Sequence, residues 1–216
     1  MEDKFDIVKL SELIGVIIGD GNIHYNSKTR KYFFEITGDP KLERDYFEYV
    51  RTLISSLLDK NPKIYVRDRG LRIRVYSKEF VEFLINKLNM PYGEGKCEKV
   101  EIPELIYSQD WGILKYCIRG ITDTDGSLFV SKKPGIEKYP GIEISTTSKN
   151  LSLQLRKIIS QKYRIGFREF KKDNYRRRYI LSINGNIMVD KWIKDIGFSN
   201  KRKLKVWERG DLNSRL

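Results

Sequence analysis

Leu13-Ile-Gly-Val-Ile-Ile-Gly-Asp-Gly21 and Ile118-Arg-Gly-Ile-Thr-Asp-Thr-Asp-Gly126 are two versions of one short motif. The first copy is apolar or glycine as far as Gly19, which predicts a buried helix without a solvent-exposed face. Ser11 and Glu12 are expected to start that helix. A glycine follows the acid in both copies, and we expect each to end its helix in the left-handed conformation.

The two motifs share small residues at a spacing of four. Gly15 and Gly19 lie on one face of the first helix, and Gly120 and Thr124 hold the same spacing in the second. Small side chains let a neighbouring backbone approach closely. The pattern therefore predicts that the two helices pack against each other along these four residues.

Such packing would bring together the acids that end the motifs, Asp20 and Asp125. An acid at a helix C-terminus is unfavourable, because it meets the negative end of the helix dipole. A divalent cation bound between two such ends would reverse the penalty. A single Asp-Gly more often opens a turn, but two copies in matching contexts favour a functional pair. Asp123 corresponds to Ile18 in the first copy, so we interpret it as structural.

The repeat continues beyond the motifs, at an offset between 105 and 108 residues. It predicts one α-β-β-α-β-β-α unit used twice, an α+β fold of two pseudo-symmetric halves, 1–105 and 106–216, each an antiparallel sheet backed by helices. In the first half strands are expected at 22–26, 31–37, 63–67 and 71–76, and helices at 42–58 and 78–88. In the second half strands are expected at 127–132, 141–146, 165–171 and 179–183, and helices at 151–161 and 187–195.

Polar side chains recur along one face of these strands. In the hairpin at 63–76, apolar residues alternate with tyrosine and arginine, so that period two separates a buried face from a solvated one. Arginine, asparagine and lysine suit base edges and phosphates in a major groove. The predicted DNA-binding residues are Asn22, His24, Asn26, Tyr65, Arg67, Arg72, Arg74, Arg168, Lys172, Arg176 and Arg178.

Composition agrees with a polyanionic partner. Lys plus Arg number 42 against 29 Asp plus Glu, a net charge of +13, which predicts salt-sensitive binding. No apolar stretch reaches membrane-spanning length and no signal-peptide core is present. We expect reduced, buried or nearly buried thiols at Cys97 and Cys117 in an intracellular protein, of prokaryotic cytoplasm or nucleoid or of an organelle. His24 is the sole histidine, which argues against a zinc site.

The paired motifs resemble the LAGLIDADG sequences of homing endonucleases, in the form that carries both motifs in one chain. The first copy keeps Leu13, Gly15 and the final Asp-Gly, and the second keeps Gly120, both aspartates and the final glycine. Because the same order of elements follows each motif, the resemblance covers nearly the whole chain. It implies two half-domains around a pseudo-twofold axis, whose sheets form a saddle over the DNA major groove.

The resemblance also implies the chemistry. Asp20 and Asp125 would bind two or more Mg²⁺ ions, which Mn²⁺ could replace, with backbone carbonyls of Gly19 and Thr124 as further ligands. Lys96 and either Lys201 or Lys203 would stabilise the charge of the transition state or position water as catalytic residues, although contact with the DNA backbone explains these lysines equally well. A glutamine position of the family falls on Gly38 and Thr146, and Gly38 has no side chain to contribute.

The implied function is an intron-encoded, site-specific endonuclease that hydrolyses both strands of duplex DNA across the minor groove and leaves short 3′ overhangs. It would act as a monomer on an asymmetric target. Two alternatives stay open: an RNA maturase that binds intron RNA, and a DNA-binding regulator of the same fold without catalysis. We expect neither an intein origin, since terminal splicing residues are absent, nor a nuclease centre built on Glu94-Gly-Lys96.

Overall fold

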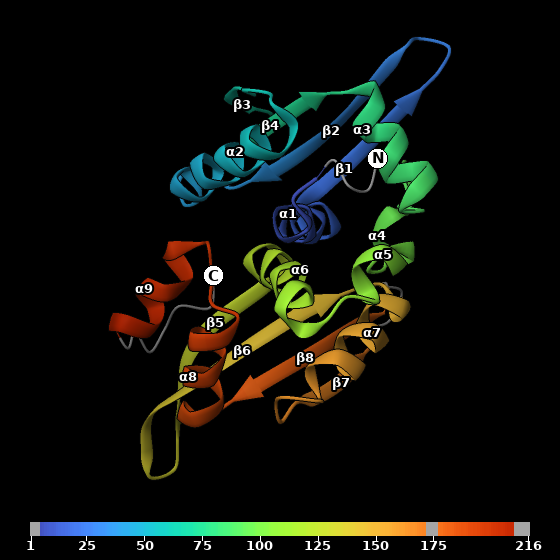
Figure 1. Cartoon of the computed structure of the whole chain (residues 1–216). Coiled ribbons are helices and arrows are strands. Elements are labelled where there is room, and N and C mark those ends of the chain that lie inside the picture. Colours follow the sequence, from blue (N-terminus) through green and yellow to red (C-terminus); the bar gives the residue numbers. More distant parts are fainter. Residues whose placement is uncertain (1–4, 172–176, 210–216) are drawn as a thin grey trace.

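In the computed structural model, which describes residues 5–171 and 177–209, the chain forms two antiparallel four-stranded sheets with the same connectivity. Their strand orders are β1-β2-β4-β3 and β5-β6-β8-β7. Figure 1 shows the sheets on either side of two central helices, α1 and α6, which lie next to each other. The predicted α+β fold of two pseudo-symmetric units is confirmed. The limits of the halves as independent domains, at residue 105, stay a prediction.

The two central helices end at the motif acids. Helix α1 spans Ile7–Asp20 and α6 spans Trp111–Asp125. The predicted start of the first helix at Ser11 is wrong, because Asp6 caps it instead, accepting hydrogen bonds from the N–H groups of Val8 and Lys9. An N-cap carboxylate satisfies amides that have no partner within the helix. Ser11 is buried inside the helix, and its hydroxyl donates to the Ile113 carbonyl.

The glycine after each acid serves a purpose that the sequence did not reveal. Gly21 and Gly126 are extended, with φ of −85° and −96°, so the predicted left-handed conformation is wrong. A Cβ at Gly21 would lie 2.5 Å from the Ile17 Cα, and one at Gly126 would lie 2.5 Å from the Thr122 carbonyl oxygen. Each glycine lets the chain turn from helix directly into the first strand of a sheet.

The strands follow the expected period of two. In the first sheet Phe34, Ile36 and Ile73 are fully buried against the helices, while their neighbours along the strand lie on the opposite face. The strands are β1 (Gly21–Asn26), β2 (Lys31–Gly38), β3 (Ile64–Arg67), β4 (Gly70–Tyr76), β5 (Gly126–Lys133), β6 (Ile136–Thr146), β7 (Gly166–Phe170) and β8 (Arg178–Asn184). Strand β6 begins five residues earlier than expected, because the β5–β6 hairpin is longer than its counterpart.

Helices cover the inner face of each sheet, and three lie outside the predicted unit. The covering helices are α2 (Arg44–Leu58), α3 (Lys78–Glu82) with a π-helical turn at Phe83–Lys87, α7 (Lys149–Ile159) and α8 (Asn186–Asp195). The additional helices are α4 (Lys96–Lys99), α5 (Glu104–Tyr107) and α9 (Lys201–Arg209). Of the two cysteines, Cys117 is buried in α6 as expected, but Cys97 in α4 is exposed. None of the described helices combines the length and the apolar character that a membrane crossing requires.

The central helices touch backbone to backbone at the predicted small residues. A Cβ added to Gly15 would collide with the Cys117 carbonyl, and one added to Gly120 would collide with the Glu12 carbonyl. Near the acids, Gly19 faces the Thr124 side chain. A bidentate ion pair between Glu12 and Arg119 closes the same interface from its side. The predicted packing along Gly15, Gly19, Gly120 and Thr124 is therefore what the structure shows.

Substitution of Gly120 by alanine should destabilise the protein by about 2–3 kcal/mol, because the added methyl group overpacks a contact between two backbones. Denaturant unfolding would measure the loss.

The matched control is Gly112→Ala at the start of the same helix, where the nearest atom to the new methyl group belongs to the Asp110 side chain. Because alanine has the higher helix propensity, Gly112→Ala should cost little or even stabilise the protein. An equal loss for both variants would show that the helix–helix contact is not the cause.

Candidate active site

Asp20 and Asp125 are brought together at the ends of the central helices. A Cβ built on Gly19 would lie 3.4 Å from the Asp125 carboxyl carbon, so the second acid lies against the residue that precedes the first. Burial raises the pKa of Asp20 to about 7, and the charges of Asp125 and Glu43 add to the effect. Burial likewise raises the pKa of Asp125 to about 6. The site thus holds two carboxylates in an environment that disfavours their negative charge.

The surroundings of Asp20 include a residue that sequence reasoning missed. Gly38, at the end of β2, leaves a space that Glu43 enters: a Cβ at Gly38 would lie 2.6 Å from Oε2 of Glu43. The Asp39 N–H donates to the same oxygen, at 2.8 Å. Thr146 stands at the equivalent place in the second sheet. The two acids therefore have different neighbours, and only the structure reveals this because Glu43 belongs to no motif.

Two buried lysines close the C-terminal ends of the motif helices. The Lys96 ammonium donates to the carbonyls of Ile17 and Gly21, both at 2.5 Å, and to Ile18 at 3.1 Å. The Lys203 ammonium donates to Thr122 at 2.6 Å and to Gly126 at 2.5 Å. These carbonyls lie at the C-terminal ends of the helices, where helical hydrogen bonding runs out, although Thr122 also accepts from the Gly126 N–H. A cation at this end interacts favourably with the helix dipole.

Of the two lysines considered for the second half, Lys201 and Lys203, it is Lys203 that lies at the position equivalent to Lys96. Lys201 is exposed at the first turn of α9, whereas Lys203 is buried and occupies the place equivalent to Lys96. Burial lowers the pKa of Lys96 to about 8, against the opposing charges of Asp125 and Asp20. Burial also lowers the pKa of Lys203. Both ammonium groups are positioned by the main chain around the acids, and their catalytic role stays a prediction.

Asp123 has the structural role expected of it. Its fully buried carboxylate accepts hydrogen bonds from the N–H groups of Ser199 and Asn200, at 2.8 and 3.2 Å, immediately before α9. These contacts fix the start of α9 and hence the place of Lys203. The first motif carries Ile18 at this position, and Lys96 is held by α4 without an equivalent acid.

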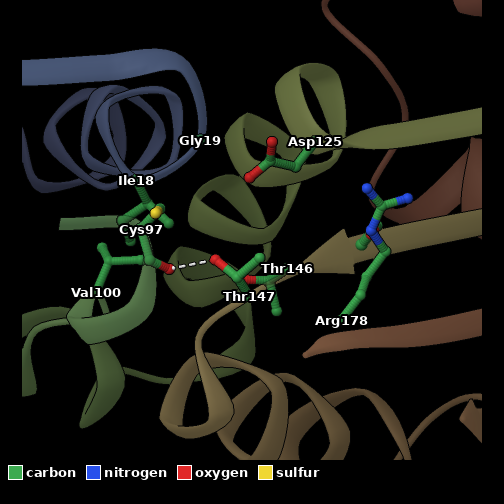
Figure 2. Close-up of a pocket in the computed structure, with 9 residues that line it drawn as sticks. Ile18, Gly19, Cys97, Val100, Asp125, Thr146, Thr147 and Arg178 are labelled. Atoms are coloured by element: carbon green, nitrogen blue, oxygen red, sulfur yellow. Dashed lines mark hydrogen bonds between the residues drawn. The ribbon is translucent and has the colours of Figure 1, made fainter. Parts of the chain in front are cut away.

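A cavity of about 400 Å³ opens beside Asp125. Gly19, Thr146 and Arg178 contribute to its wall. Figure 2 shows the guanidinium of Arg178 extending from β8 towards Asp125, with Thr146 and Thr147 below. Thr147 donates to the Cys97 carbonyl at 2.9 Å and so ties this wall to α4. Arg178 therefore lies at the edge of the candidate active site, and its contact with DNA stays a prediction.

The remaining predicted DNA-binding residues lie on or beside the sheet faces turned away from the helices. His24 stacks on Phe33 with ring centroids 4.7 Å apart, and Asn22 is exposed beside it on β1. Asn26 caps the hairpin turn by accepting from the Thr29 N–H.

The carboxylate of Glu35 is contacted by Tyr65, Arg72 and Arg74. Arg67 is exposed and lies near Asp68, and Arg168 is exposed and lies near Glu143. Lys172 and Arg176 lie outside the described residues.

The two acids suit a hard divalent ion. Carboxylate and main-chain carbonyl oxygens are the ligands that Mg²⁺ and Ca²⁺ take, and the carbonyls of Gly19 and Thr124 precede the acids in the last turn of each helix. Within residues 5–171 and 177–209, no group of three or more His, Cys, Asp or Glu side chains forms a metal cluster. A divalent ion here would therefore share two carboxylates and depend on substrate oxygens for further ligands.

The fold is that of the LAGLIDADG homing endonucleases. The homing endonuclease I-WcaI bound to its DNA recognition sequence superposes with a TM-score of 0.64 at 15% identity, covering 97% of this chain and 88% of that one. I-DmoI in complex with DNA and Mn gives 0.59 at 19% identity, covering 89% and 98%. The N-terminal LAGLIDADG domain of WhiA gives 0.55 at 17% identity, covering 92% and 86%. At such identities the likeness concerns the fold.

Sequence comparison adds relatives of other kinds. The replication factor C small subunit of Methanocaldococcus jannaschii is 35% identical over 205 residues, which are 91% of this chain and 10% of that subunit. An uncharacterised protein of the same organism is 29% identical over 210 residues, 90% of this chain and 68% of that protein. The chain thus spans about a tenth of the subunit's length. No family model matches it.

Asp20→Asn should stabilise the protein at pH 8 in the absence of divalent ions, by about 2 kcal/mol once partial exposure is allowed for. The folded-state pKa of Asp20 is raised to about 7 from 3.8, so ionisation of this acid costs stability progressively as pH rises between these values. The gain should therefore shrink as pH falls and vanish near pH 4. Thermal unfolding in EDTA at pH 8, 6 and 4 would measure it.

Addition of Mg²⁺ at pH 8 should raise the melting temperature of the wild-type chain more than that of Asp20→Asn, because an ion bound to the folded state stabilises it. The exposed acid Glu137 supplies the control variant Glu137→Gln. If Asp20→Asn stabilised the protein equally at pH 8, 6 and 4, ionisation of the buried Asp20 carboxylate would not be the cause of the gain.

Proposed function

We propose that this chain is a single-chain LAGLIDADG homing endonuclease, which cuts both strands of duplex DNA at one specific, asymmetric site. The observation that carries the proposal is the meeting of Asp20 and Asp125 at the ends of two helices packed backbone to backbone. A protein without a use for these acids would gain stability by replacing them, because each opposes the other's charge and the helix dipole.

The rest of the molecule fits a DNA substrate. Two sheets turn polar faces away from the helices, and a β-ribbon or sheet of this kind enters a major groove. The net charge of +13 favours the phosphate backbone. Solved structures of the same fold include I-DmoI in complex with DNA and Mn and in complex with DNA and Ca. We take residues 1–105 and 106–216 as the halves that would each bind one half-site, within a monomer in the cell interior.

In the proposed reaction the carboxylates of Asp20 and Asp125 would hold the divalent ions. When bound, such ions polarise phosphoryl oxygens and favour ionised water at neutral pH. Lys96 and Lys203 contribute positive charge beneath the acids, and because they are bound to the main chain they need no reorganisation as charge develops. Arg178 is placed to bind a phosphate oxygen beside Asp125.

Asp20→Asn and Asp125→Asn should each reduce double-strand cleavage at least a hundredfold while changing DNA affinity no more than about threefold, because each removes a charged ligand without altering the sheets. Incubation of a genomic or randomised duplex library with the wild-type chain and Mg²⁺ would first identify the target. Plasmid linearisation and gel-shift assays on that target would then compare the variants.

Short 3′ overhangs at a single sequence are the expected product. Linearisation by either variant at the wild-type rate would remove that acid from the mechanism. Absence of cleavage by the wild-type chain on every duplex, with Mg²⁺ and with Mn²⁺, would overturn the proposed function.

Arg178→Ala should slow cleavage of one DNA strand about tenfold or more relative to the other, because Arg178 shares a cavity wall with Asp125 while the equivalent position in the first sheet is Gly70, which has no side chain. End-labelled duplexes would report each strand separately.

Arg177→Ala is the matched control, since its guanidinium forms an exposed ion pair with Glu169, at 2.8 Å. Equal slowing of both strands by Arg178→Ala would assign this residue to general DNA binding instead.

A further inference from the structure

Three donors converge on one carboxylate on the open face of the first sheet. Arg72 donates to Oε1 of Glu35 at 2.6 Å, Arg74 donates to Oε2 at 2.7 Å, and the Tyr65 hydroxyl donates to Oε2 at 2.9 Å. Glu35 itself is only 6% exposed. Burial acts to raise its pKa, but the hydrogen bonds from Arg74, Arg72 and Tyr65 outweigh it, and the pKa lies below the usual value. The carboxylate is therefore ionised, and the two guanidinium groups with this carboxylate carry a net charge of about +1.

The two guanidinium groups are held rigidly. The guanidinium of Arg74 also lies over the Phe33 ring, 4.4 Å from its centroid, and Phe33 in turn stacks on His24. The Nε of Arg72 donates to the Arg67 carbonyl at 3.3 Å. Side chains fixed in this way lose little conformational entropy on binding. A long, free arginine would instead lose most of its rotamer freedom.

Charge and geometry favour base edges over phosphates as the ligand of these arginines. A carboxylate at the centre of the cluster repels phosphate and halves the attraction that two free arginines would exert. N–H groups that remain on a fixed, planar guanidinium suit the two acceptors of a guanine. Arg72 and Arg74 are two residues apart on β4, about 6.8 Å, which matches two base-pair steps along a groove.

The second sheet lacks this arrangement. Glu143 occupies the place of Glu35, but the positions of Arg72 and Arg74 in the central strand are taken by Ile180 and Ser182. Among the residues that the structure describes, the arginine bound to Glu143 is Arg168, which comes from the edge strand β7 and whose side chain is 65% exposed. The two faces that would read the two half-sites therefore differ in how firmly their arginines are held.

We propose that Glu35 is a positioning residue for sequence recognition, which fixes Arg72 and Arg74 so that the first sheet reads guanines in its half-site more stringently than the second sheet reads its own. This inference rests on the proposed function, because it presupposes a DNA duplex against the sheets. It assigns to Glu35 a role in selectivity and none in cleavage.

The test measures base preference in EDTA, where no cleavage occurs. The full chain and its Glu35→Gln variant would each be selected against a duplex library randomised across the target, with Glu143→Gln as the matched control. Glu35→Gln should reduce the preference for guanine at two positions of one half-site about tenfold, and raise affinity for unrelated duplex, because a negative charge is lost. Glu143→Gln should leave those two positions unchanged.

Arg74→Lys provides a second variant that keeps the charge but removes the planar group; it should relax one of the two positions. Thermal unfolding of all variants separates misfolding from altered recognition. Retained guanine preference in Glu35→Gln, or an even loss of affinity across all sequences, would overturn the role of Glu35 alone. A wild-type chain that prefers no duplex sequence would overturn the proposed function as well.

Discussion

The close contact between α1 and α6 is the constraint on which the rest of the structure depends. At Gly15 and Gly120 the two backbones touch, and that contact sets the distance between the helix ends. The helix ends carry Asp20 and Asp125, and each chain continues from its acid straight into the first strand of a sheet. One packing distance therefore fixes both the separation of the acids and the placement of two sheets about a common axis.

The sequence predicted this arrangement because its main signals are local. Apolar runs, the spacing of small residues and strands of period two survive in a single chain without an alignment, and the repeat supplied a check at every element. Strand limits came within one or two residues except at the longer β5–β6 hairpin. The pairing of Asp20 with Asp125 followed from the duplicated motif and the spacing of its small residues, whereas the raised pKa values of the two acids were not predicted.

What escaped prediction depends on contacts between distant segments. A lysine in a charged loop looks like a surface residue, and only the fold shows Lys96 and Lys203 buried against helix ends. Glu43 reaches Asp20 because Gly38 leaves room, which requires the register of β2 against α2. Asp6 caps the first helix five residues before the expected start at Ser11, since a helix buried all round gives no amphipathic pattern to mark its beginning.

Closure of the two helix ends occurs at different times in the life of the polypeptide. The carbonyls at the end of α1 receive their ammonium from Lys96, before α6 exists, whereas those of α6 wait for Lys203 in α9, which follows the entire second sheet. Synthesis proceeds from the N-terminus, so a nascent chain presents one finished acid and later a second, unfinished one. The second acid therefore acquires its complete surroundings only when synthesis has passed α9, whereas the lysine that closes the first helix end is made before the second central helix.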